Sequence, residues 1–217
     1  AIAGFALSLP LYTSFQSLHG GMQFVENLPW IERFNINYHL GVDGISMLFL
    51  VLNSFTTILV VIAGWEAIDK RVSQYMAAFL IMSGLINGTF AALDAILFYV
   101  FFEAMLIPMY LVIGVWGGPN RVYAAIKFFL YTLIGSLLML VAFIYLYYRS
   151  AGSFNILDFH NLRINEVWSG SVPMLGYSFS IPVQTMLFAA FFVSFAVKVP
   201  ISPVHTWLPG AHGEAPT

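Results

Sequence analysis

Apolar residues in this chain are gathered into long unbroken runs, separated by two longer polar stretches. Most runs approach the roughly 20 residues that a helix needs to cross a hydrocarbon core about 30 Å thick. Unbroken runs exclude the alternating strands of a membrane barrel, and lipid offers the backbone no hydrogen-bond partners outside a helix. The pattern predicts helices over residues 1–15, 43–65, 75–92, 94–115, 122–148 and 182–202, with polar connections at 16–42 and 149–181.

The composition supports a single transmembrane domain over residues 1–217, built as an all-α, polytopic helix bundle. Hydrophobic residues make up 60% of the chain and charged residues 8%, whereas an ordinary soluble domain carries about 25% charged residues. The net charge of -2, without any basic run, argues against nucleic-acid binding. Since there are no cysteines, the chain can hold neither a thiolate metal site nor a cysteine-ligated iron–sulfur cluster.

The two ends of the sequence are typical of a fragment. The chain begins at Ala1 without an initiator Met, and it stops at Thr217 within a polar, Pro-rich stretch. We therefore expect at least one helix before the first residue and further helices after the last.

Basic residues divide between the two ends of the expected bundle. One end carries Lys70, Arg71, Arg121 and Lys127, and the other carries Arg33, Arg149 and Arg163. Because cytoplasmic loops of membrane proteins carry more Lys and Arg, the first end is predicted to face the cytoplasm or the mitochondrial matrix.

Glu103 lies near the middle of the fourth apolar segment, on the same helical face as Tyr99 and Tyr110. A carboxylate at the bilayer centre costs about 2.5 to 3.5 kcal/mol on insertion scales, so it should face a partner or water. A protonated Glu that only joins two helices is the structural alternative. Intramembrane ionisable residues usually mark ion or proton pathways, which favours Glu103 as a proton-transfer residue.

Lys198 presents the same argument in the last segment, just before Pro200 and Pro203. Each proline removes a backbone donor and disfavours a continuing helix, so nearby carbonyls need other polar partners. A broken helix beside a buried charge is a recurrent ion site in transporters, although a Lys near a segment end can also extend its amine to the membrane surface. If Glu103 lies close, moving or neutralising its carboxylate would make the Lys198 ammonium release a proton.

Four further titratable residues are weaker candidates. Lys127 either relays protons or extends to the surface. Asp94 separates two helices, where a capping role is expected, although proton uptake or relay stays open. His205 and His212 are candidate proton-relay groups at the helix break. Their spacing, even with Glu214, fits no zinc pattern, so we predict no metal site.

Three motifs, in this order, resemble the antiporter-like subunit M family of bacterial NADH:quinone oxidoreductase, whose mitochondrial counterpart is chain 4 of complex I. They are Phe102-Glu103-Ala104-Met105-Leu106-Ile107-Pro108-Met109-Tyr110, Ile126-Lys127-Phe128-Phe129-Leu130-Tyr131-Thr132, and Phe195-Ala196-Val197-Lys198-Val199-Pro200 followed by His205-Thr206-Trp207-Leu208-Pro209. The resemblance extends over essentially all of the chain. Gly210 and Gly213 depart from it, because the family has an acidic residue and a larger residue at these positions.

The resemblance implies inverted helix repeats and a non-redox subunit of a proton-pumping enzyme, not catalytic alone. It implies that Glu103 and Lys198 are the paired charges of one half-channel, with Lys127 and His205 nearby. This chain would hold no cofactor, whereas neighbouring membrane subunits of the complex and their partners would supply quinone, FMN and iron–sulfur clusters. The expected location is the bacterial cytoplasmic membrane, in contact with lipid, or the mitochondrial inner membrane.

Two other functions remain open on the sequence alone. A subunit of a multi-subunit cation/proton antiporter or of a membrane-bound hydrogenase would share the same helices. A structural membrane scaffold would use its buried charges only to hold helices together.

Overall fold

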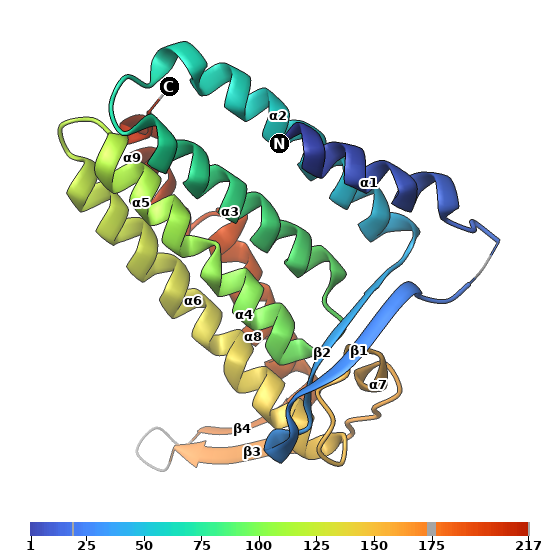
Figure 1. The fold of residues 1–217 in the computed structure, drawn as a ribbon. Helices are drawn as coiled ribbons and strands as arrows, with labels where there is room; N and C mark the ends of the chain where they lie inside the picture. Colours follow the sequence, from blue (N-terminus) through green and yellow to red (C-terminus); the bar gives the residue numbers. More distant parts are fainter. Residues whose placement is uncertain (19, 173–176, 217) are drawn as a thin grey trace.

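The computed structural model describes residues 1–18, 20–172 and 177–216 as a bundle of long helices with short strands at one end (Figure 1). Within these residues, α2, the α4–α5 pair and α6 are long and apolar enough to cross a membrane, and α1 and α8 are shorter apolar helices. The helices are α1 (Ile2–Ser14), α2 (Gly44–Ala67), α3 (Val72–Ala91), α4 (Ala95–Ala104), α5 (Leu106–Trp116), α6 (Arg121–Arg149), α7 (Ile156–Phe159), α8 (Val183–Lys198) and α9 (Leu208–Glu214). The predicted helical membrane bundle is therefore confirmed.

The two polar connections contain strands, which the apolar pattern did not predict. In the first, β1 (Gln23–Ile31) and β2 (Ile36–Val42) form an antiparallel hairpin. Its turn is the short 3₁₀ helix Glu32–Phe34, followed by Asn35 in the left-handed conformation that Asn tolerates. In the second connection, β3 (Val167–Val172) pairs with β4 (Tyr177–Pro182). Both hairpins lie at the end of the bundle opposite α9 (Figure 1).

Helix α6 lies alongside both α5 and α8 (Figure 1). The close approach of α8 depends on Gly135, because a Cβ at that position would stand 2.9 Å from the Cβ of Val197. Small residues allow membrane helices to approach closely where no hydrophobic force pulls them together. Gly135 thus sets how near the end of α8, and Lys198 with it, comes to the bundle centre.

Two predicted helices are shorter or more broken than their apolar runs. The single helix expected over 94–115 is interrupted at Met105, which separates α4 from α5. Pro108 falls in the first turn of α5, where its missing N–H is tolerated. The helix expected over 182–202 ends at Lys198, two residues before Pro200. Apolar residues continue past both interruptions. Pro108 and Pro200 lack the backbone N–H that a continuing helix would use, so the hydrogen bonds along each helix end there.

Candidate functional site

The two helix interruptions meet inside the bundle, where the end of α8 contacts the end of α4. The Lys198 ammonium donates a hydrogen bond of 2.5 Å to the backbone carbonyl of Phe102. The same Nζ stands 3.2 Å from the centre of the Phe102 ring, within the range of a cation–π interaction. Phe195, one turn earlier on α8, packs edge-on against that ring at 6.0 Å between centroids. Lys198 is therefore directed toward α4 and not toward the membrane surface.

Glu103 directly follows Phe102, and its carboxylate lacks a hydrogen-bond partner among the described residues. Both carboxylate oxygens are buried and accept no hydrogen bond from the described residues. Ser136 of α6 lies beside the carboxylate, but its hydroxyl donates to the Leu133 carbonyl at 2.9 Å. Lys198 interacts electrostatically with Glu103, yet among the described residues no Glu103 oxygen lies within 4.0 Å of the Lys198 nitrogen. The two charges are coupled without forming a closed ion pair.

The backbone at the end of α8, just before Lys198, is held by a residue from the following turn. The indole N–H of Trp207 donates a 2.8 Å hydrogen bond to the Val197 carbonyl. The Trp207 ring packs on Phe128 of α6 at 5.2 Å between centroids. A freed carbonyl at membrane depth needs such a polar partner, so Trp207 stabilises the interruption that places Lys198.

The remaining relay candidates do not join this contact. Lys127 is half-buried on α6, about 13 Å along the helix axis from Ser136. His205 lies in the turn between α8 and α9, with a buried Nδ1 that has no hydrogen-bond partner in the described part of the chain. His212 is exposed on α9. Relay roles for these three residues stay predictions.

Asp94 has the capping geometry that the sequence predicted. Its Oδ1 accepts hydrogen bonds from the N–H groups of Ile96 and Leu97, in the first turn of α4. Its Oδ2 accepts a third from the N–H of Asn37 on β2, which joins the hairpin to the bundle. Asp94 is only 2% exposed, and burial raises the pKa of its carboxyl although all three amides favour the anion. The capping role is confirmed, and proton uptake through Asp94 stays a prediction.

The described part of the chain contains no group of three His, Asp or Glu side chains placed to hold a metal ion. Glu214 accepts hydrogen bonds from the backbone and side-chain nitrogens of Asn120, before α6. At Gly210 and Gly213 an added Cβ would meet nothing within 4 Å. A Cβ at either position would therefore fit this backbone.

Sequence reasoning missed three residues that shape the site. Phe102 supplies both the carbonyl and the ring that hold Lys198, Ser136 lies beside Glu103, and Trp207 fixes the break. Phe102 and Trp207 stand inside the quoted motifs, but no periodicity distinguishes them from packing residues. Ser136 would have been found only as a small polar residue in an apolar helix.

A family model described as "NADH:quinone oxidoreductase/Mrp antiporter, TM" matches residues 92–217, more than half of the chain. The chain belongs to this family. Glu103, Lys127, Lys198 and His205 all lie within the residues that match the NADH:quinone oxidoreductase/Mrp antiporter model. The family that the three motifs indicated is thus confirmed.

Curated relatives match this chain over its whole length or nearly so. The chain is 49% identical over 217 residues to "NADH-quinone oxidoreductase subunit M" of Rhodobacter capsulatus, covering 100% of this chain and 41% of that protein. It is 44% identical over 214 residues to "NADH-ubiquinone oxidoreductase chain 4" of Arabidopsis thaliana, covering 98% of this chain and 40% of that protein. The chain thus spans about two fifths of the length of these curated relatives.

Solved structures of NADH:quinone oxidoreductase/Mrp antiporter complexes contain the same fold. A chain of "Respiratory complex I from Thermus thermophilus with bound NADH" matches with a TM-score of 0.79 and 32% identity, over 97% of this chain and 40% of that chain. A chain of the Mrp complex from Dietzia sp. DQ12-45-1b matches with a TM-score of 0.78 and 17% identity, over 97% and 22%. The second likeness shows the fold alone.

Proposed function

We propose that this chain is part of a proton-translocating membrane subunit of an NADH:quinone oxidoreductase. The names of its relatives support the complex. The observation that carries the proton-transfer role is the buried Glu103 carboxylate, which accepts no hydrogen bond from the described residues, beside Lys198 at two meeting helix breaks. A purely structural buried carboxylate is normally hydrogen-bonded, because leaving one without a partner is costly.

The two charges can control one another. While Glu103 is an anion, its attraction favours the ammonium form of Lys198. When Glu103 takes up a proton or moves away, Lys198 keeps only the Phe102 carbonyl and ring. Its ammonium then releases a proton to the next acceptor and becomes a neutral amine. The proton that Glu103 took up then passes to the neutral Lys198 amine, which restores the Glu103 anion and the Lys198 ammonium and completes a cycle without a redox step in this chain.

The proposal also covers the cofactors, partners and location of the chain. The chain transfers no electrons and holds no cofactor, whereas quinone, FMN and iron–sulfur clusters belong to other subunits of the complex. Neighbouring antiporter-like subunits are its partners in a bacterial cytoplasmic or mitochondrial inner membrane. Lys127 and His205 extend the proton path, and Asp94 and His212 are candidates for proton uptake or relay.

The test measures NADH-driven proton uptake in membrane vesicles that carry the assembled complex with Glu103→Gln or Lys198→Ala. Each change should lower proton uptake and the coupled NADH:quinone rate by about tenfold or more, because the lost group transfers a proton in each turnover. Blue-native gels should show normal amounts of assembled complex. Glu26→Gln, which removes an exposed carboxylate on β1, serves as the matched control and should leave both rates unchanged.

Each alternative function predicts a different result. A structural scaffold predicts normal proton uptake in assembled Glu103→Gln complexes, and this result would refute the proposed role. A cation/proton antiporter or hydrogenase subunit predicts that the protein purifies without NADH:quinone activity. The 49% identity to a protein named NADH-quinone oxidoreductase subunit M favours the first function.

A further inference from the structure

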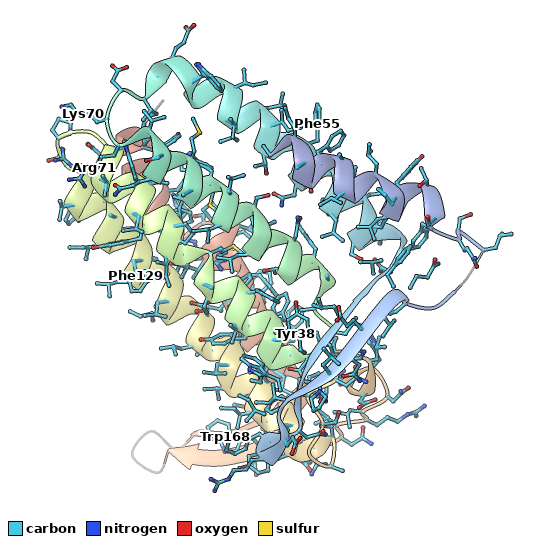
Figure 2. All side chains as sticks on the ribbon, in the orientation of Figure 1. Tyr38, Phe55, Lys70, Arg71, Phe129 and Trp168 are labelled. Carbon is cyan, nitrogen blue, oxygen red and sulfur yellow. The ribbon has the colours of Figure 1, made fainter. Side chains whose placement is uncertain are left out.

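A polar recess opens at the α9 end of the bundle, where the α2–α3 turn approaches the end of α5. Its volume is about 640 Å³, and Lys70, Arg71 and Arg121 contribute to its walls. Figure 2 shows Lys70 and Arg71 in that turn, beside the loop that joins α5 to α6. Among the described residues, none of the three cations has a carboxylate partner within 4.0 Å. Asp69 also lines the recess, and the Glu214 carboxylate lies at the adjoining Gly118–Asn120 turn, so the three cations outnumber these two carboxylates.

An apolar groove of about 480 Å³ lies directly beside this recess, between α3 and α5. Small side chains such as Ala77 and Ala78 form its α3 wall, and Ile107 and Leu111 form its α5 wall. From Trp116 to Ile107 the groove follows α5 for about 13 Å. This length matches much of an acyl chain that enters the membrane from its surface.

The recess and the groove share Arg71, Val115 and Trp116 as a common wall. Trp116 is fixed there, because its indole N–H donates a 2.7 Å hydrogen bond to the Lys70 carbonyl and its ring packs edge-on against Tyr75. Trp residues favour the boundary between lipid headgroups and acyl chains. The charged part of the cavity thus lies on the headgroup side of this boundary, and the apolar part lies on the acyl side.

We propose that this combined surface binds an anionic phospholipid, with its phosphate in the Lys70–Arg71–Arg121 recess and one acyl chain in the α3–α5 groove. Basic pockets between membrane helices on the cytoplasmic or matrix side favour anionic headgroups. The side of the membrane agrees with the orientation expected from the distribution of cations. The binding site is separate from the proton-transfer residues and does not rest on the proposed function.

The test uses the purified full-length protein in nanodiscs of phosphatidylglycerol and phosphatidylcholine with identical acyl chains. Native mass spectrometry after release from the nanodiscs counts the lipids of each kind that remain bound. The unchanged protein should retain phosphatidylglycerol in preference. Each basic residue near an anionic headgroup contributes roughly a fivefold preference. K70Q/R71Q/R121Q should therefore lower the ratio of retained phosphatidylglycerol to retained phosphatidylcholine by about tenfold or more.

Two further variants separate this site from simpler explanations. R33Q/R149Q/R163Q removes the same number of charges at the opposite end of the bundle and should leave the ratio unchanged. Ala77→Phe fills the groove without altering any charge, and it should reduce lipid retention. Inorganic phosphate added to the unchanged protein should not displace the lipid, because phosphate alone does not occupy the groove. Circular dichroism and gel filtration confirm that each variant is folded.

Three results would overturn the proposal. The first is equal retention of both lipids by the unchanged protein. The second is an equal effect of the two triple variants, which would indicate general charge attraction. The third is crosslinking of Arg71→Cys in the assembled complex to a neighbouring protein subunit in place of lipid.

Discussion

Helix α4 carries a buried carboxylate near each of its ends, and the two differ in what surrounds them. Asp94 precedes the first turn and accepts three backbone N–H hydrogen bonds. Glu103 lies in the last turn, and its buried oxygens accept no hydrogen bond from the described residues. The first amides of a helix are free to bind an acceptor, whereas amides within the helix are already used. Position along one helix therefore gives one carboxylate three backbone donors and leaves the other with none among the described residues, as the proposed proton transfer requires.

The largest effect on stability should separate these two carboxylates directly. Asp94→Ala should lower the free energy of unfolding by about 3 to 5 kcal/mol, because three buried amides lose their acceptor. Glu103→Gln removes no hydrogen bond and should change it by less than about 1 kcal/mol. Thermal unfolding in detergent, followed by circular dichroism, measures both. Equal destabilisation by the two changes would show that Glu103 also has a structural role.

A smaller effect should come from the contact that positions Lys198. Gly135→Ala places a Cβ 2.9 Å from the Cβ of Val197 and should push α8 away from α6. Overpacking of this kind costs about 1 to 3 kcal/mol, and proton uptake should fall as Lys198 moves away from Phe102.

Gly84→Ala is the matched control for Gly135→Ala, since nothing lies within 4 Å of its added Cβ. It should be neutral or stabilising by up to about 1 kcal/mol, because Ala favours a helix more than Gly. A Gly135→Ala protein with normal stability and proton uptake would contradict the close packing of α6 and α8.

The smallest effect should appear in the pH dependence of unfolding, through two aspartates that both cap helices. Burial raises the pKa of Asp94 above 3.8, so its contribution favours the folded state at low pH and is lost as pH rises through the raised value. The Ser46 N–H lowers the pKa of Asp43, before α2, so its contribution is present above 3.8 and lost on acidification.

Unfolding midpoints of Asp94→Asn and Asp43→Asn between pH 3 and 7 check these opposite signs. In the unchanged protein Asp94 lowers the unfolding midpoint as pH rises toward neutral, and Asp94→Asn should abolish this fall. Asp43 lowers the midpoint as pH falls, and Asp43→Asn should abolish that fall. Changes of the same sign in both variants would disagree with burial as the dominant influence on Asp94.

The sequence predicted much of the bundle, because apolar runs and prolines act locally. Long apolar runs indicated the helices, and Pro200 indicated that α8 would break near Lys198. The interruption at Met105 was missed, because the continuous apolar run over 94–115 outweighed the interior Pro108, which removes a backbone donor and breaks the helix one turn before it. The hairpins were missed too, because β1 is exposed along almost its whole length and so shows no alternation of buried and exposed positions.

The site was predictable only in part. Glu103 and Lys198 are visible in the sequence because charges are rare in apolar segments. Their convergence depends on how α8 packs across α4 and α6, which no spacing within one helix encodes. The contacts of Phe102 and Trp207 arise from backbone carbonyls at the breaks, and the sequence shows such carbonyls only indirectly.

The most direct test of the account is a double-mutant cycle on proton uptake in assembled complexes. It compares Glu103→Gln, Lys198→Ala and the double variant with the unchanged protein. If the two residues transfer protons as one coupled unit, the double variant should be no slower than the slower single variant. Effects that multiply would mean that Glu103 and Lys198 act independently, which contradicts the central claim.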